Sequence, residues 1–288
     1  MAFDIDGGRV HRRLADVAVT SQWRTAFRVG DRRVLGVADG VFTMSDDFMS
    51  VPGYQHRFDD ATGRANLPVG SFVVEGEQTV LVDAGIGPFA IEGLVGGNLL
   101  DELAAVGVRP ADVDVVAVSH LHLDHDGWIA TRDAGVTFPN ATVHIGRGDY
   151  ERFVIGDPGD EFRVARHKKE ALVALFDAGR VELVDDVTEI VPGVVAMPTP
   201  GHTPGHLAFA IRDRAERLLI LGDSMYCPAQ LTDMDLTAMH DVDPVLARRS
   251  RELLARELES HETRTEAIGC HFPGLRAARI LRGEAVTP

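Results

Sequence analysis

Four side chains that can bind metal ions fall within six residues of one segment. Residues Ser119–His125 read Ser-His-Leu-His-Leu-Asp-His, which places His120, His122, Asp124 and His125 close together in the chain. Side chains of an extended segment alternate between its two sides, so His120 and His122 point the same way while the leucines point toward the core. Imidazole nitrogens and carboxylate oxygens are ligands that suit zinc, and also iron or manganese. The segment therefore predicts the core of a metal site.

Further candidate ligands lie where other strands are expected to end. His202 and His206 belong to the segment Thr-Pro-Gly-His-Thr-Pro-Gly-His, Asp223 follows the apolar run Leu-Leu-Ile-Leu-Gly, and His271 follows Ala-Ile-Gly-Cys. Ligands gather at such strand-to-loop junctions in layered α/β folds. A single histidine is more often a satisfied polar residue than a ligand. The ordered series of strand-terminal His and Asp residues, however, favours one shared site.

The pattern of apolar residues predicts strands and helices in alternation. Strands are expected over residues 34–41, 69–75, 79–83, 113–119, 141–145, 181–184, 193–198, 206–212, 217–221, 266–270 and 277–282. Helices are expected over 91–106, 160–178 and 244–260, with Asp243 as the N-cap beside Pro244. Strand clusters followed by helices, twice along the chain, favour a mixed α/β fold in which two packed sheets have helices outside them. Residues 1–30 are polar and irregular, which favours an arm or a contact with a partner subunit.

Composition narrows the classes of protein that need consideration. The chain has 288 residues, of which 45% are hydrophobic, and a net charge of −15. Such an acidic chain repels phosphate backbones, so nucleic acid is not an expected partner. No apolar run has the length of a membrane span, and the first residues lack the apolar core of a signal peptide. With only Cys227 and Cys270, no disulfide framework is expected, and we expect a cytoplasmic protein with both cysteines as small buried residues.

The ordered set of candidate ligands resembles that of the metallo-β-lactamase superfamily, from about residue 34 to the C-terminus. The resemblance implies an α/β fold, a four-layer αββα sandwich of two mixed β-sheets flanked by helices, in one catalytic domain over residues 31–288. It also implies two divalent metal ions, zinc before iron or manganese. By this resemblance the first ion would be held by His120, His122 and His202, the second by Asp124, His125 and His271, and Asp223 would bridge them. His206 would be structural.

The resemblance also assigns roles around the metal ions. Asp83 resembles the family's aspartate that orients a ligand histidine, since ligating imidazoles usually donate their second N–H to a carboxylate or carbonyl; an ordinary turn aspartate is the alternative. The Asp-x-x-Tyr spacing of Asp223 and Tyr226 resembles that of the N-acyl homoserine lactonases. The Tyr226 phenol could bond the oxyanion or the leaving alkoxide, and the alternative is a packing tyrosine. Asp124 is expected to carry a proton to the leaving group.

Two further stretches bear on the substrate. Residues 41–58 contain six large apolar or aromatic side chains, Phe42, Met44, Phe48, Met49, Tyr54 and Phe58. They could form an apolar lid over an acyl or aromatic substrate, or else pack against a partner subunit in a homodimer. Residues 270–275 (Cys-His-Phe-Pro-Gly-Leu) resemble superfamily members that act on esters and organophosphates, such as methyl parathion hydrolases.

These observations predict a dinuclear metal-dependent hydrolase with a metal-bridging hydroxide as nucleophile. A lactonase or carboxylic ester hydrolase is the leading hypothesis, with a small-molecule substrate that carries an apolar acyl or aromatic part. A glyoxalase II-like thioesterase and an organophosphate or aryl ester hydrolase are alternatives, although no basic cluster suits a glutathione carboxylate. A non-catalytic metal-binding protein is the alternative of another class. Structural zinc sites are closed and usually rich in thiolates, whereas this candidate site is rich in His and Asp and lies on loops.

Overall fold

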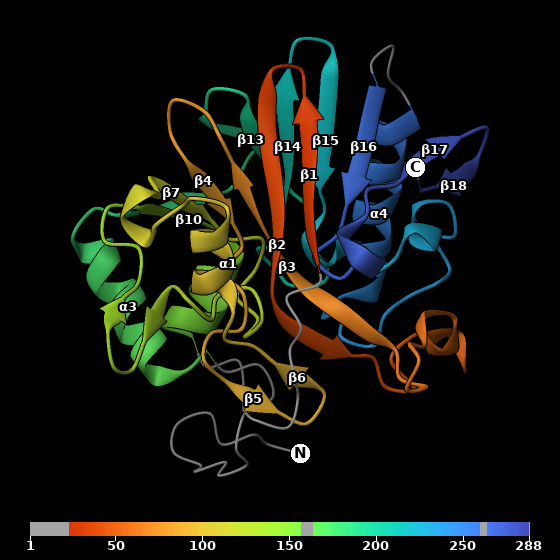
Figure 1. Ribbon diagram of the computed structural model, residues 1–288, viewed down its shortest axis with the longest axis horizontal. Coiled ribbons are helices and arrows are strands. Elements are labelled where there is room, and N and C mark those ends of the chain that lie inside the picture. The colour runs from red at the N-terminus through yellow and green to blue at the C-terminus, as the bar shows by residue number, and fades with distance from the viewer. Residues whose placement is uncertain (1–22, 157–163, 260–263, 288) are drawn as a thin grey trace.

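The structure, a computed structural model, describes residues 23–156, 164–259 and 264–287 (Figure 1). Its larger sheet has nine strands in the order β11-β10-β7-β4-β3-β2-β6-β5, with β1 pairing to β2. These strands are β1 Arg24–Val29, β2 Arg32–Thr43, β3 Asn66–Val74, β4 Val80–Val82, β5 Ala90–Ile91, β6 Leu94–Val95, β7 Val115–Ala117, β10 Thr142–Gly146 and β11 Val181–Val184.

The second sheet has five strands in the order β12-β13-β14-β15-β16. They are β12 Thr188–Val191, β13 Val194–Pro198, β14 Leu207–Asp213, β15 Glu216–Ile220 and β16 Arg264–Ile268. Two small hairpins, β8–β9 and β17–β18, complete the strands. They comprise β8 Ala130–Thr131, β9 Gly135–Val136, β17 Arg279–Leu281 and β18 Glu284–Val286.

The α-helices lie on the outer sides of the two sheets, as Figure 1 shows for α1, α3 and α4. They are α1 Leu99–Ala105, α2 Arg147–Asp149, α3 Arg166–Asp177 and α4 Pro244–Glu259, and a π-helix at Tyr150–Ile155 follows α2. Strand alternation creates two cores. In β4, Val80 and Val82 join the core between the sheets, whereas Leu81 joins the core beneath α1 and α3. The result is the expected four-layer order of helix, sheet, sheet and helix.

Most expected elements are present, but the helix expected over residues 91–106 is wrong in its first half. That part forms the short antiparallel strands β5 and β6, and α1 begins only at Leu99. Gly93 and Gly97 adopt φ values of 80° and 120°, which an α-helix cannot contain. The helical spacing of Leu and Ile was therefore misleading here, because glycines at positive φ allow this segment to form a β-hairpin.

The ends of other elements differ more modestly from the expectation. Residues 24–29 form β1, so the irregular segment expected over 1–30 ends sooner, and residues 1–22 lie outside the described residues. Part of the helix expected over 160–178 also lies outside them, and α3 begins at Arg166. The Asp243 cap of α4 is confirmed, because its Oδ1 accepts a hydrogen bond from the Leu246 N–H at 2.9 Å. The division into an arm and one catalytic domain stays a prediction.

The strands that lead into the candidate ligands end at one edge of the sandwich. β4 and β7 run parallel to each other in the larger sheet, and β15 and β16 run parallel in the second sheet. β13 is antiparallel to β14, which is antiparallel to β15, so β13 points the same way as β15. Their carboxyl ends therefore bring five separate loops together. Within the described ranges, no helix is both long and apolar enough to cross a membrane.

Candidate metal centre

Three imidazoles converge from two loops to make the first ligand set. His120 and His122 follow β7, and His202 lies in the loop between β13 and β14. Nδ1 of His122 lies 3.0 Å from Nε2 of His120 and 3.0 Å from Nε2 of His202. The side chains of His120 and His202 are buried. Their ring nitrogens meet at one point, as the sequence predicts.

A second ligand set lies beside the first. Nε2 of His271, which follows β16, is 3.4 Å from Oδ2 of Asp124. Nε2 of His125 is 3.7 Å from Oδ1 of the same carboxylate. The Asp124 side chain is 15% exposed, whereas those of His125 and His271 are at most 1% exposed. Asp124 is therefore the most solvent-exposed member of this set.

Asp223 lies between the two sets and presents one carboxylate oxygen to each. Its Oδ2 is 3.9 Å from Nε2 of His120 and 3.7 Å from Nε2 of His202. Its Oδ1 is 3.3 Å from Nε2 of both His125 and His271. The structure thus brings together all seven candidate ligands predicted from the sequence, with Asp223 between the two sets.

The donor atoms of this cluster fit two divalent cations. Oδ1 of Asp223 and Nε2 of His125 are buried and have no hydrogen-bond partner among the described residues. Buried polar atoms are normally satisfied, so such orphaned atoms call for an explanation. Five imidazoles and two carboxylates that converge on two points are a ligand set that divalent transition metals accept. Bound cations would satisfy both orphaned atoms.

The two ligand sets differ in their electrostatics. Burial, together with the neighbouring imidazoles, holds the pKa of His120 and His122 well below 6.5, so both rings are neutral. Burial alone would also lower the pKa of His271, but the carboxylates of Asp223 and Asp124 raise it to about 10. Without a bound cation, the His271 imidazole in the second set is therefore protonated at neutral pH. A cation bound here would compete with that proton, so its affinity would fall at low pH.

Hydrogen bonds from the surrounding chain fix the ligand rings. Asp83, the candidate orienting residue, accepts at Oδ2 a bond from Nδ1 of His125 at 2.9 Å, and at Oδ1 a bond from the Ser119 N–H at 2.7 Å. Nδ1 of His271 donates to the Pro68 carbonyl at 2.9 Å. Each ring thereby directs Nε2 toward the cluster.

His206 lies beside the cluster without joining either ligand set. Its Nδ1 bonds the Thr199 hydroxyl at 2.8 Å, and its Nε2 accepts the Asp223 N–H at 3.1 Å. Both ring nitrogens of His206 are thus hydrogen-bonded, and the ring supports the backbone of Asp223. This agrees with the structural role expected for His206.

Two supporting carboxylates were not found by sequence analysis. Asp241 Oδ1 lies 3.2 Å from Nδ1 of His202. Asp149 accepts hydrogen bonds from the N–H groups of Leu121 at 3.0 Å and Gly205 at 2.6 Å, which ties the two histidine loops together. Neither aspartate lies at a recognisable spacing from the histidine it supports, so the sequence contains no signal that indicates its role.

An aromatic wall stands beside the second ligand set. The Tyr226 ring stacks on His271 with centroids 5.4 Å apart and an interplanar angle of 8°. Phe48 contacts the Tyr226 ring edge-on at 4.8 Å, and Phe42 lies 5.2 Å from His271. Burial, and then the Asp223 carboxylate, raise the pKa of Tyr226 well above 10, so its phenol keeps its proton. Residues 41–58 therefore contribute to the wall of the site.

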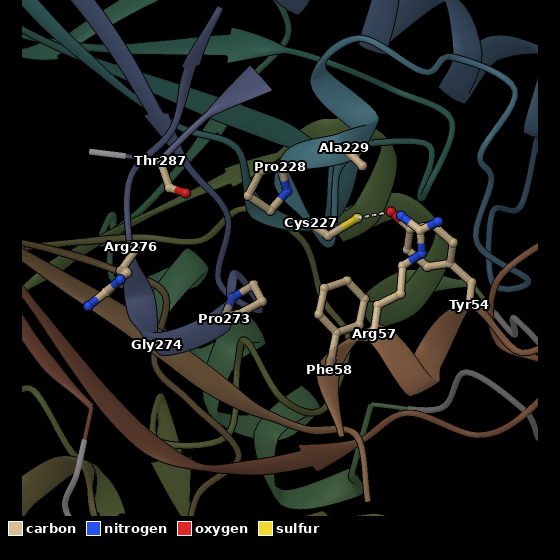
Figure 2. A pocket seen from close by; sticks show the side chains of 10 residues that line it. All are labelled: Tyr54, Arg57, Phe58, Cys227, Pro228, Ala229, Pro273, Gly274, Arg276 and Thr287. Carbon is tan, nitrogen blue, oxygen red and sulfur yellow. Dashed lines mark hydrogen bonds between the residues drawn. The ribbon is translucent and has the colours of Figure 1, made fainter. Parts of the chain in front are cut away.

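An apolar hollow of about 640 Å³ adjoins this wall (Figure 2). Its lining residues are Tyr54, Arg57, Phe58, Cys227, Pro228, Ala229, Pro273, Gly274, Arg276 and Thr287. Cys227 follows Tyr226 in the chain and is buried, with its thiol 3.9 Å from the Tyr54 hydroxyl. Cys270 is buried as well, 3.1 Å from Asp83 Oδ2. Both cysteines are thus small buried residues, as expected.

Comparison with known proteins identifies the family. Residues 66–260, more than half of the chain, match the sequence model of the Metallo-beta-lactamase superfamily. The chain belongs to the metallo-β-lactamase superfamily. An N-acyl homoserine lactonase of Bacillus cereus is 28% identical over an alignment of 215 residues that covers 67% of this chain and 78% of the relative. The N-acyl homoserine lactonase AttM of Agrobacterium fabrum is 35% identical over an alignment of 132 residues that covers 44% of this chain and 47% of the relative.

Solved structures of the superfamily share the fold. AidC, a dizinc quorum-quenching lactonase in complex with a product, matches with a TM-score of 0.76 and 20% identity, over 92% of this chain and 97% of that chain. The hydrolase AbOPH matches with a TM-score of 0.75 and 23% identity, over 93% and 97% of the two chains. The αββα fold expected from the sequence is confirmed, as is the similarity to the N-acyl homoserine lactonases.

Proposed function

We propose that this chain is a dinuclear metal-dependent hydrolase that opens lactones or related carboxylic esters. The observation that carries the proposal is the place of Asp223, whose two oxygens face two separate sets of ligands at 3.3 to 3.9 Å. A single ion would leave one of the two ligand sets without a metal. It would also leave the Asp223 oxygen that faces that set without a cation. The lactonase relatives support the choice of ester bond.

The ligand residues define what the centre would do. His120, His122 and His202 would hold one ion and Asp124, His125 and His271 the other, with Asp223 between them; zinc is the proposed metal, and iron or manganese would also suit these donors. Divalent ions held by these residues would supply a hydroxide nucleophile at neutral pH and would polarise the carbonyl of a substrate.

Two side chains would complete the reaction. The protonated Tyr226 phenol is a hydrogen-bond donor for the oxyanion that develops when the ester carbonyl is attacked. Burial alone would raise the pKa of Asp124, but His125 and His271 outweigh it and lower the pKa to about 2. Asp124 is therefore ionised, and its side chain is 15% exposed. The further role that we assign to it, carrying a proton to the leaving alkoxide, rests on this partly open place beside the second ligand set.

The aromatic wall favours a substrate with an apolar part. Phe42 and Tyr226 present rings next to His271, and Phe48 lies against Tyr226. An acyl chain or aromatic group could pack beside these rings. The described residues support a role for residues 41–58 as a wall of the active site. A contact of the same segment with a second subunit, and hence a homodimer, stays a separate expectation.

A substrate panel with parallel metal analysis tests this function. Purified chain, loaded with zinc, is assayed on acyl lactones, aryl esters, thioesters and phosphotriesters, and the bound metal is measured by mass spectrometry. We expect two ions per chain and the highest kcat/KM on lactones. Two bound ions with a preference for thioesters or phosphotriesters would replace the lactonase assignment. Less than one ion per chain and no hydrolysis of any of these substrates would contradict the enzyme itself.

A further inference from the structure

His202 has a carboxylate behind it that the ligand pattern does not include. Nδ1 of His202 lies 3.2 Å from Oδ1 of Asp241, while its Nε2 points to the first ligand set. The side chains of His202 and Asp241 are both 1% exposed. A proton on Nδ1 that bonds Asp241 leaves the lone pair on Nε2, which is the tautomer a metal ligand needs.

A buried arginine holds Asp241 in turn. Nη1 of Arg251, on α4, donates to Asp241 Oδ2 at 3.0 Å, and the Arg251 side chain is 1% exposed. Nε and Nη2 of this guanidinium have no hydrogen-bond partner within the described ranges of the chain. The ion pair with Asp241 therefore offsets the burial of the Arg251 charge. Removal of one partner would leave the other charge buried and uncompensated.

The start of α4 holds the His202 loop by its backbone as well. The Val242 N–H donates to the His202 carbonyl at 3.1 Å, and the Asp243 N–H donates to the Gly201 carbonyl at 2.9 Å. A Cβ on Gly201 would lie 2.0 Å from the Ala247 nitrogen, so the loop packs directly on the first turn of α4. The Asp241–Arg251 pair thus lies where α4 packs against the loop that contains the candidate ligand His202.

The two ligand sets are supported in matching ways. Asp83 accepts the Nδ1 bond of His125 in the second set, as Asp241 does for His202 in the first. Asp83 otherwise receives neutral donors, from the Ser119 backbone and hydroxyl and from the Cys270 thiol. Asp241 alone of the two is paired with a guanidinium.

We propose that Asp241 and Arg251 are a positioning pair for the first metal ion. Asp241 fixes the tautomer and direction of the His202 ring, and Arg251 holds the Asp241 carboxylate in place. The pair couples the packing of α4 to metal affinity at one of the two positions. This inference rests on the proposed dinuclear centre but concerns residues that touch neither substrate nor metal.

Asp241→Asn tests the carboxylate, and Glu102→Gln is the matched control. Glu102 is also a buried carboxylate paired with an arginine, Arg24, but it lies on α1 beneath the larger sheet. The metal-free full-length proteins are titrated with zinc against a chelating dye, and folding is followed by urea unfolding. We expect Asp241→Asn to weaken one of the two zinc-binding steps by about 10- to 100-fold and to leave the other within about twofold. Glu102→Gln should leave both steps unchanged.

Arg251→Lys and Arg251→Met separate charge from packing. Lys keeps the positive charge beside Asp241, so we expect it to restore most of the affinity that Met loses at the same step. The inference is overturned if Asp241→Asn binds both ions like the wild type, if it weakens both steps equally, or if Lys and Met behave alike. A wild-type chain that binds no zinc would instead contradict the proposed function.

Discussion

The role given to Tyr226 makes the sharpest test of the chemistry. Tyr226→Phe removes the phenolic oxygen and keeps the ring, so the stacking on His271 and the edge contact with Phe48 remain. Because the pKa of the phenol is raised well above 10, the wild-type group is a donor throughout the range of an enzyme assay. Loss of one donor to a developing oxyanion costs about 10²-fold in kcat, or about 2.7 kcal/mol of transition-state stabilisation.

We therefore expect Tyr226→Phe to lower kcat on an acyl lactone by about 10²-fold, with KM and bound metal unchanged. Stopped-flow or steady-state assays on zinc-loaded protein, with metal analysis of the same samples, measure all three. Tyr150→Phe is the matched control, since Tyr150 is also buried but lies in the core beneath α1 and α3, where its ring stacks on Phe176. It should keep the wild-type rate. Equal rates for wild type and Tyr226→Phe would refute the assignment and leave Tyr226 as a packing residue.

Three other expectations follow from the structure. His122→Ala removes the ring that both other imidazoles of its set face, so bound metal by mass spectrometry should drop and hydrolysis should cease; undiminished metal would contradict the ligand role. Gly201→Ala should lower the free energy of unfolding by at least about 2 kcal/mol, because the new Cβ would contact the Ala247 backbone. Gly179 also has a positive φ, but no atom lies within 4 Å of a Cβ there, so Gly179→Ala should lower the free energy of unfolding by less in the same urea titration. Burial raises the pKa of all three tyrosines, that of Tyr54 to about 12. The tyrosines of the unfolded chain therefore ionise first, so the free energy of unfolding should fall as pH rises from about 10 through 12. A urea midpoint that stays constant over this range would contradict this expectation.

The ligands of the candidate centre could be read from the sequence because their signal is local. Alternation places His120 and His122 on one side of an extended segment, and the other ligands each follow an apolar run that ends in a loop. Parallel strands bring such ends to one edge, so residue type and position in the element were enough. The same local logic failed over residues 91–106, where glycines at positive φ turn an apparently helical spacing into β5 and β6.

What supports the ligands was decided by tertiary structure. His202 and Asp241 are 39 residues apart, and Asp149 joins loops 28 and 56 residues away from it. No periodicity links such positions, because their contact depends on how α4 and the two sheets pack rather than on the geometry of one element. The sequence by itself indicated which side chains could bind metal and at which strand ends they lie, and the family resemblance already implied that Asp223 lies between the two sets. Only the folded chain decided that a buried Asp241–Arg251 pair stands behind one of these sets.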